Sequence, residues 1–230
     1  MKKVAIVQSN YIPWKGYFDL INSVDEFILY DDAQYTRRDW RNRNKIMTSQ
    51  GVQWLTIPVN QVDFEQKIID TTVSDKSWSK KHWKSITQNY SKATFFEEYR
   101  REIENLYMDC QEDKLSNINY NFITTINKIL GIKTKIRWSG EFELVEGKTM
   151  KLLDICKQCG ADTYLSGPAA KDYFDMELAK EVGIKVEWMD YSGYPDYRQL
   201  HKPFEHGVTV LDLIFNEGPN AVSFMKTFNK

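Results

Sequence analysis

The sequence has few cysteines and histidines, no surplus of either charge and no long apolar run. Its 230 residues include three cysteines and three histidines, and 31 basic side chains nearly balance 32 acidic ones. Nucleic-acid-binding proteins usually carry a basic surplus, so we expect no nucleic-acid partner. No apolar run approaches the ~20 residues that a membrane-spanning helix needs, and the N-terminal apolar stretch is too short for a signal peptide. The composition therefore predicts a cytoplasmic protein without a membrane span.

The scarce cysteines also argue against metal and redox chemistry. Cys156 and Cys159 have CxxC spacing, but no second pair and no nearby histidine accompanies them. Residues 148–158 are typical of a helix, and both thiols fall near its C-terminal end, where the helix dipole does not lower a thiol pKa. We therefore expect buried, unreactive cysteines and no metal site.

Short apolar runs alternate with helical patterns along most of the chain. Strands are expected at 3–7, 26–30, 52–59, 132–138, 163–165 and 185–189, and helices at 16–23, 148–158, 172–182 and 209–216. This alternation favours an α/β fold with a mostly parallel, Rossmann-like (nucleotidyltransferase-like) sheet. Between about 74 and 130, three amphipathic patterns predict a helical insertion subdomain. No linker or repeat interrupts the chain, so residues 1–230 are expected to form a single α/β domain.

Aromatic residues, by contrast, are abundant, with 13 Tyr, 12 Phe and 7 Trp. Several lie in QSNYIPWKGYFDLI (8–21), directly after the first predicted strand, where a sheet of this kind usually binds its ligand. The following helix could present free N–H groups to an anion. The four residues 14–17 stand where nucleotidyltransferase-like folds have HxGH, but both histidines are replaced, so that chemistry is not assumed. Packing of the loop by its own aromatics is the alternative to a ligand site with contacts from Gln8, Asn10, Tyr11, Trp14, Lys15 and Gly16.

A second polar segment, DDAQYTRRDWRNRNK (31–45), follows the second predicted strand. Arginine side chains bind phosphate or carboxylate in a bidentate manner, and a carboxylate can bind sugar hydroxyls or act as a base. We predict Asp31 and Asp32 as candidate catalytic residues; a solvated charged surface is the alternative. The further ligand contacts predicted here are Gln34, Tyr35, Arg37, Arg38, Asn42, Arg43 and Asn44.

These two segments resemble the WbqC-like protein family. The resemblance continues in WLTIPV (54–59), WSKKHWKSITQNYSKATFF (78–96), YLSGPAAKDY (164–173) and VTVLDLIFNEG (208–218). The family is named for a protein of bacterial O-antigen gene clusters, and some similar sequences have been described as glycine or aminoacyl transferases. The resemblance therefore implies a role in surface-polysaccharide synthesis.

The later family blocks supply further candidate residues. His82, on a predicted helix, is a third candidate catalytic base, although a lone helical histidine is more often structural. Ser166, Gly167 and Lys171 follow a predicted strand, where they could bind an anion or simply form a capped turn. His201 lies in a late loop and is a further candidate ligand contact.

The leading hypothesis is an enzyme of surface-glycan (O-antigen) biosynthesis. It would form an amide by transferring an acyl or aminoacyl group to an amino sugar or a sugar nucleotide. The cofactor is left open between none, an acyl-CoA or aminoacyl donor, and ATP. One alternative is an ATP- or nucleotide-dependent enzyme that activates a carboxylate or transfers a nucleotidyl group. Another is a non-catalytic sugar-nucleotide-binding protein. A homodimer is also left open, since nothing in the sequence sets the oligomeric state.

Overall fold

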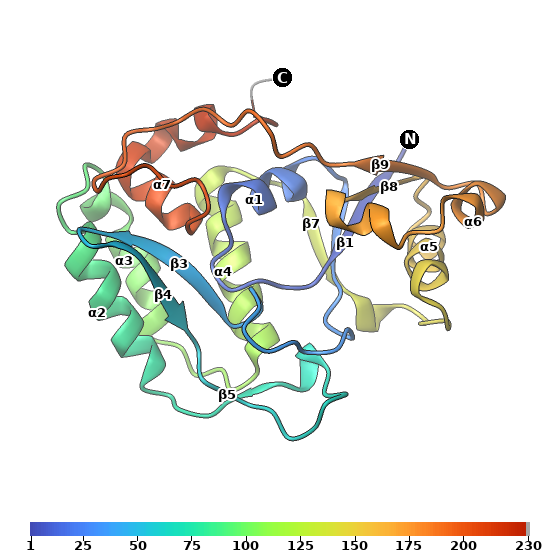
Figure 1. Ribbon diagram of the computed structural model, residues 1–230, viewed down its shortest axis with the longest axis horizontal. Helices are drawn as coiled ribbons and strands as arrows, with labels where there is room; N and C mark the ends of the chain where they lie inside the picture. Colours follow the sequence, from blue (N-terminus) through green and yellow to red (C-terminus); the bar gives the residue numbers. More distant parts are fainter. Residues whose placement is uncertain (229–230) are drawn as a thin grey trace.

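The computed structural model describes residues 1–228, and a five-stranded sheet lies at its centre (Figure 1). Its strands are β1 (Lys3–Val7), β2 (Glu26–Leu29), β7 (Lys135–Trp138), β8 (Thr163–Ser166) and β9 (Lys185–Trp188). The strand order is β7-β2-β1-β8-β9, and every neighbouring pair is parallel. The predicted Rossmann-like α/β fold is confirmed.

Helices cover both faces of this sheet, which explains why the inner strands β1 and β2 are nearly continuous apolar runs. In β1, Ala5 belongs to one buried apolar cluster, whereas Val4 and Ile6 belong to another, as the alternation of side chains along a strand requires. The first cluster includes residues of α1 (Lys15–Asn22), α4 (Leu115–Leu130) and α7 (Val210–Glu217); the second includes residues of α5 (Lys148–Gln158) and α6 (Met176–Glu181).

Three helices fill the region predicted to be helical between 74 and 130. They are α2 (Trp78–Tyr90), α3 (Phe96–Met108) and α4. Gly131 ends α4 with a φ of 73°, a left-handed conformation that favours glycine. Apolar residues of all three helices join the first cluster, so they pack against the same core as one face of the sheet (Figure 1). No helix within residues 1–228 combines the length and apolar character needed to cross a membrane.

The strand predicted at 52–59 is present over most of its length, but it does not belong to the central sheet. β4 (Gly51–Thr56) instead pairs antiparallel with β3 (Arg43–Thr48) in a separate hairpin. Leu55 of β4 is buried while Trp54 is exposed, because only one side of the hairpin packs on the protein. Two further short strands, β5 (Val59–Asn60) and β6 (Thr72–Val73), also pair with each other. The helix expected from 172 begins at Met176, where Asp175 accepts a hydrogen bond from the backbone N–H of Leu178.

The order in which strands are added to the sheet reverses between β1 and β8. From β1 the strands continue to β2 and β7 on one side, and from β8 to β9 on the other. The β1–β8 pairing joins Lys3 to Thr163 and Val4 to Tyr164, and stops before either strand reaches its carboxyl end. Open α/β sheets bind ligands at such a switch point, beyond the carboxyl ends of the strands.

Candidate functional site

A cleft of about 760 Å3 opens at this switch point. Its walls come from the loops after β1 and β2, from the end of β8 with the turn that follows, and from the start of α5. This volume is within the ~300–1,000 Å3 typical of small-molecule sites. The sequence-predicted residues that line it are Gln8, Asn10, Trp14, Asp32, Gln34, Ser166 and Gly167.

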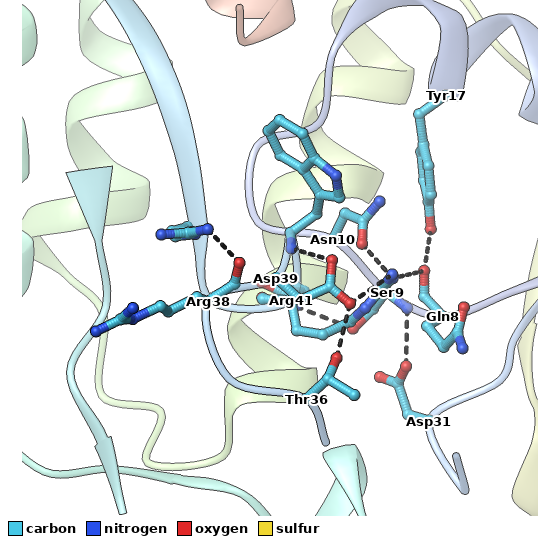
Figure 2. Close-up of polar contacts among 12 residues, drawn as sticks. Gln8, Ser9, Asn10, Tyr17, Asp31, Thr36, Arg38, Asp39 and Arg41 are labelled. Atoms are coloured by element: carbon cyan, nitrogen blue, oxygen red, sulfur yellow. Dashed lines mark hydrogen bonds and ion pairs between the residues drawn. The ribbon is translucent and has the colours of Figure 1, made fainter. Parts of the chain in front are cut away.

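The polar edge of the cleft is held in place by Arg41, which the sequence analysis did not single out (Figure 2). Its guanidinium donates to the side-chain Oδ1 of Asn10 and, over 3.4 Å, to the backbone carbonyl of Gln8. Tyr17 donates its hydroxyl hydrogen to the same carbonyl at 3.0 Å. Because Oδ1 of Asn10 is turned toward Arg41, its Nδ2 group remains without a partner in residues 1–228. Asn10 therefore has a free donor at the cleft.

The two candidate aspartates have different surroundings. Asp31 is 1% exposed and accepts hydrogen bonds from the Ser9 backbone N–H at 2.8 Å and from the Ser116 hydroxyl at 2.6 Å. Burial raises the pKa of the Asp31 carboxyl above its usual value. Asp32 lines the cleft and contacts Lys67 Nζ at 3.1 Å and the Ser139 hydroxyl at 2.8 Å. Asp31 therefore holds the loop after β1 in place through Ser9, whereas Asp32 is the aspartate that lines the cleft.

One wall of the cleft carries two lysines that the sequence analysis missed. Lys148 and Lys151 lie in the first turn of α5 and line the cleft, and neither pairs with any acidic group in the described chain. Their spacing of three residues puts them on one face of a predicted helix, which was the available signal. The cleft lining is also rich in aromatic rings, which are Trp14, Tyr17, Tyr30, Trp40, Tyr164, Tyr173 and Tyr191.

A smaller hollow of about 300 Å3 adjoins the cleft. Asn10, Trp14 and Trp40 line both, so these three side chains form the boundary between them. The other residues that line the smaller hollow are Pro13, Asn44, His206 and Gly207. Asn44 is buried and donates to the backbone carbonyls of Tyr11 and Ile12 at 3.0 and 2.9 Å. It thereby supports the loop where Ile12 has a φ of 36°.

His82 and Tyr11 lie in the core and do not line the cleft. The Nε2 atom of His82 is 3.2 Å from the Thr56 carbonyl oxygen, which can only accept, so Nε2 carries the proton. Nδ1 then accepts from the Tyr11 hydroxyl at 2.9 Å. Burial lowers the pKa of His82 to about 4. His82 is therefore a neutral packing residue between Trp78 and Tyr11, whose rings surround it.

Lys15 and Gly16 are also placed away from the cleft lining. Lys15 is 2% exposed, donates to the Pro195 carbonyl at 3.2 Å and lies about 5 Å from the ring centres of Tyr194 and Tyr197. Burial lowers the pKa of this lysine to about 8. The cation thus stabilises the packing of the C-terminal loop on α1 instead of facing the site.

The remaining predicted residues are dispersed. Tyr35, Arg37, Arg38, Asn42 and Arg43 line a different hollow, which has no lining residue in common with the cleft. Lys171 is exposed and lies 5.8 Å from the ring centre of Trp188. His201 donates from Nε2 to the Asn89 carbonyl at 3.0 Å.

The two cysteines with CxxC spacing lie in the interior. Cys156 and Cys159 are free and buried, and burial raises the pKa of Cys156 to about 12 and that of Cys159 to about 11. Across residues 1–228, no three or more His, Cys, Asp or Glu side chains are grouped so that they could hold a metal ion.

The fold and the cleft define a Rossmann-like α/β protein with a polar and aromatic cleft at the sheet's switch point. The chain belongs to the WbqC-like protein family, whose family model matches residues 8–224. It is 49% identical over 227 residues to the uncharacterized protein Rv1507c of Mycobacterium tuberculosis (strain ATCC 25618 / H37Rv), a match covering 98% of each chain. No solved structure matches the chain significantly.

Proposed function

We propose that the protein is a cytoplasmic transferase of surface-glycan (O-antigen) biosynthesis. It joins an acyl or aminoacyl group to the amine of an amino sugar, free or carried by a sugar nucleotide. The observation that carries this proposal is the cleft at the β1–β8 switch point, which is lined by unpaired lysines and by several aromatic rings. Membership of the WbqC-like family supports the glycan assignment.

The chemistry of the walls fits a sugar nucleotide. Lys148 and Lys151 provide positive charge for a diphosphate, and no described carboxylate neutralises them. The tyrosine and tryptophan rings offer flat apolar surfaces for a nucleobase or the face of a sugar. Asp32 and the amides of Gln8 and Asn10 supply hydrogen-bonding groups for hydroxyls.

The neighbouring hollow fits the acyl group. Its walls include Pro13, Trp14 and Trp40, and Asn10 lies on the boundary where the two substrates would meet. In the transfer, the amine nitrogen attacks the carbonyl carbon of an acyl thioester or aminoacyl ester. The new C–N bond forms as the bond to the leaving sulfur or oxygen breaks. Asp32 accepts the proton lost by the amine, and that proton then neutralises the leaving group.

The developing negative charge on the carbonyl oxygen needs a hydrogen-bond donor. The Nδ2 group of Asn10 is held free for this by the contact between Oδ1 and Arg41. A fixed donor of this kind typically contributes about 10²–10³ in rate.

A thermal-shift panel followed by turnover assays tests the proposal. The panel contains UDP-, GDP- and dTDP-amino sugars, ATP and acyl-CoA compounds. A ligand at one hundred times its dissociation constant stabilises the fold by about 2.7 kcal/mol. We expect protection by an amino-sugar nucleotide and, with an acyl donor present, a product heavier by the acyl group. Protection by ATP with release of pyrophosphate or ADP would instead favour a carboxylate-activating enzyme. Protection without turnover by any donor would favour a binding protein.

A further inference from the structure

A third hollow lies beside the β3–β4 hairpin and is separate from the cleft. It has a volume of about 540 Å3, and three arginines line it, which are Arg37, Arg38 and Arg43. We infer that it is a binding site for the phosphate group of a small molecule, independent of the proposed transferase cleft.

The charge of this arginine pocket is not neutralised. Its lining contains three arginines and no aspartate or glutamate. None of the three forms an ion pair within residues 1–228, although other arginines do. Arg41 pairs with Asp39 and Arg137 with Glu26. Arg37 and Arg38 are exposed and Arg43 is half-buried, and positive groups gathered around one hollow without a counter-charge attract an anion.

Two of the arginines are already held in position. The Nε group of Arg37 donates to Oε1 of Gln61, which leaves its terminal nitrogens for another acceptor. The guanidinium of Arg43 stacks on the Trp54 ring, 4.1 Å from the ring centre, and donates to the Arg38 carbonyl. Side chains fixed in this way lose less conformational entropy when they bind a ligand.

The backbone of this segment is also unusual. Arg38 has a φ of 58°, a left-handed conformation that is uncommon for a residue with a side chain. Such strained positions concentrate at ligand sites, where the surrounding structure maintains them.

The remaining polar lining suits a tetrahedral anion. Thr56 and Ser74 line the pocket, and their hydroxyls make no hydrogen bond to any residue that the structure describes. Two hydroxyl donors beside three guanidinium groups match the several acceptor oxygens of a phosphate, which arginine binds in a bidentate manner. The phosphate could be free or esterified to a sugar, and the pocket chemistry is the same for both.

A fluorine NMR titration of the full chain, labelled with 5-fluorotryptophan, tests this site directly. Trp54 reports on the pocket through Arg43, and its resonance is assigned by its loss in Trp54→Phe. Inorganic phosphate and glucose 1-phosphate are titrated separately at constant ionic strength. We expect a saturable shift of the Trp54 resonance with at least one of them, and a dissociation constant raised at least tenfold in Arg37→Gln/Arg38→Gln.

The controls separate this site from surface charge and from the cleft. Arg100→Gln/Arg101→Gln removes the same charge from two exposed positions on α3 and should change the dissociation constant less than twofold. Lys148→Gln/Lys151→Gln should leave the Trp54 response intact even if the proposed cleft function fails. A response to phosphate alone would identify a free-anion site, and a response to glucose 1-phosphate an esterified one. No Trp54 shift with either probe, or an equal shift in Arg37→Gln/Arg38→Gln, would overturn the inference.

Discussion

The indole ring of Trp14 lies against the backbone of Gly16, so closely that a Cβ atom on Gly16 would be 2.3 Å from ring atom Cζ2. The ring also makes edge contacts with Tyr191 and Tyr194, with centroid distances of 5.3 and 5.6 Å. Glycine at position 16 therefore allows the Trp14 ring, which lines the cleft, to pack on the start of α1.

Gly16→Ala should move this ring and destabilise the protein. We expect the free energy of unfolding to fall by about 1–3 kcal/mol, as is typical for an added methyl group in a packed site. Urea denaturation followed by tryptophan fluorescence measures this change. Gly140→Ala is the matched control, because its nearest atom would be 3.9 Å away. Equal stability of the two variants would contradict the close packing.

His82 should make folding sensitive to acid. The unfolded histidine takes up a proton near pH 6.5, whereas the folded one does so only near pH 4. Its contribution to stability is therefore complete above pH 6.5 and is lost as the pH falls toward 4. The slope is about 1.4 kcal/mol per pH unit, for a total of roughly 3 kcal/mol.

Comparing wild type with His82→Gln by urea denaturation between pH 4 and 8 isolates this effect from the titration of carboxylates. The variant should show a smaller loss, and His201→Gln should behave as the wild type. Because His82 does not line the cleft, His82→Gln should also retain ligand protection at pH 7.5. Loss of binding without loss of stability would restore His82 as a candidate catalytic residue.

Substitutions of Asp31 and Asp32 should have different effects, one on stability and the other on turnover. Asp31→Ala leaves the buried Ser9 and Ser116 donors unpaired, and we expect a loss of about 2–4 kcal/mol in the free energy of unfolding. Asp32→Asn preserves the shape of a half-buried side chain and should alter stability by less than about 1 kcal/mol. It should nevertheless reduce turnover at least a hundredfold. Unchanged turnover would exclude Asp32 as the base.

The cleft lysines should contribute to binding a phosphorylated ligand. Lys148→Gln/Lys151→Gln should weaken protection by a sugar nucleotide at least tenfold, with a smaller dependence on salt, because two positive charges are lost. Lys157→Gln, on an exposed turn of the same helix, should leave binding unchanged. Equal weakening by both variants would point to general electrostatic attraction.

The CxxC thiols should be inert in the folded protein. At pH 8, a thiol with the pKa of Cys159 is ionised in only roughly one molecule in a thousand, and Cys156 still less. Titration with a disulfide reagent should therefore detect at most Cys110 quickly, and all three cysteines after denaturation. A Cys110→Ser variant should show no fast reaction. A rapid reaction of that variant would revive a redox role for the pair.

The sequence predicted the helices well because their signals are local. Residues 148–158 were predicted as a helix, and α5 has those bounds, since its apolar spacing and following Gly160 depend only on nearby residues. Residues 52–59 were assigned to the wrong sheet, because an apolar run shows that a strand is buried without showing its partner. The turn at Gly51, with a φ of 100°, pairs this strand with the preceding polar segment.

The site was harder to predict than the fold. Asp31 and Asp32 are neighbours in sequence, yet one points into the core and the other to the cleft, and this depends on Ser116 from a distant helix. Three of the four arginines in the 31–45 segment line a separate pocket, whereas Arg41 bonds to residues at the edge of the cleft. Residues of this segment line either the cleft or the arginine-lined hollow, depending on where the β3–β4 hairpin lies. The position of the hairpin is set by tertiary packing, which the sequence pattern does not show.

The short pairing between β1 and β8 has a mechanical consequence. The sheet consists of two halves, β7-β2-β1 and β8-β9, and the cleft begins where the hydrogen bonds between them stop. A ligand in the cleft touches both halves, so its binding energy opposes their separation. Amide hydrogens along this seam should then exchange with solvent more slowly when the cleft is filled, including those of residues that never touch the ligand.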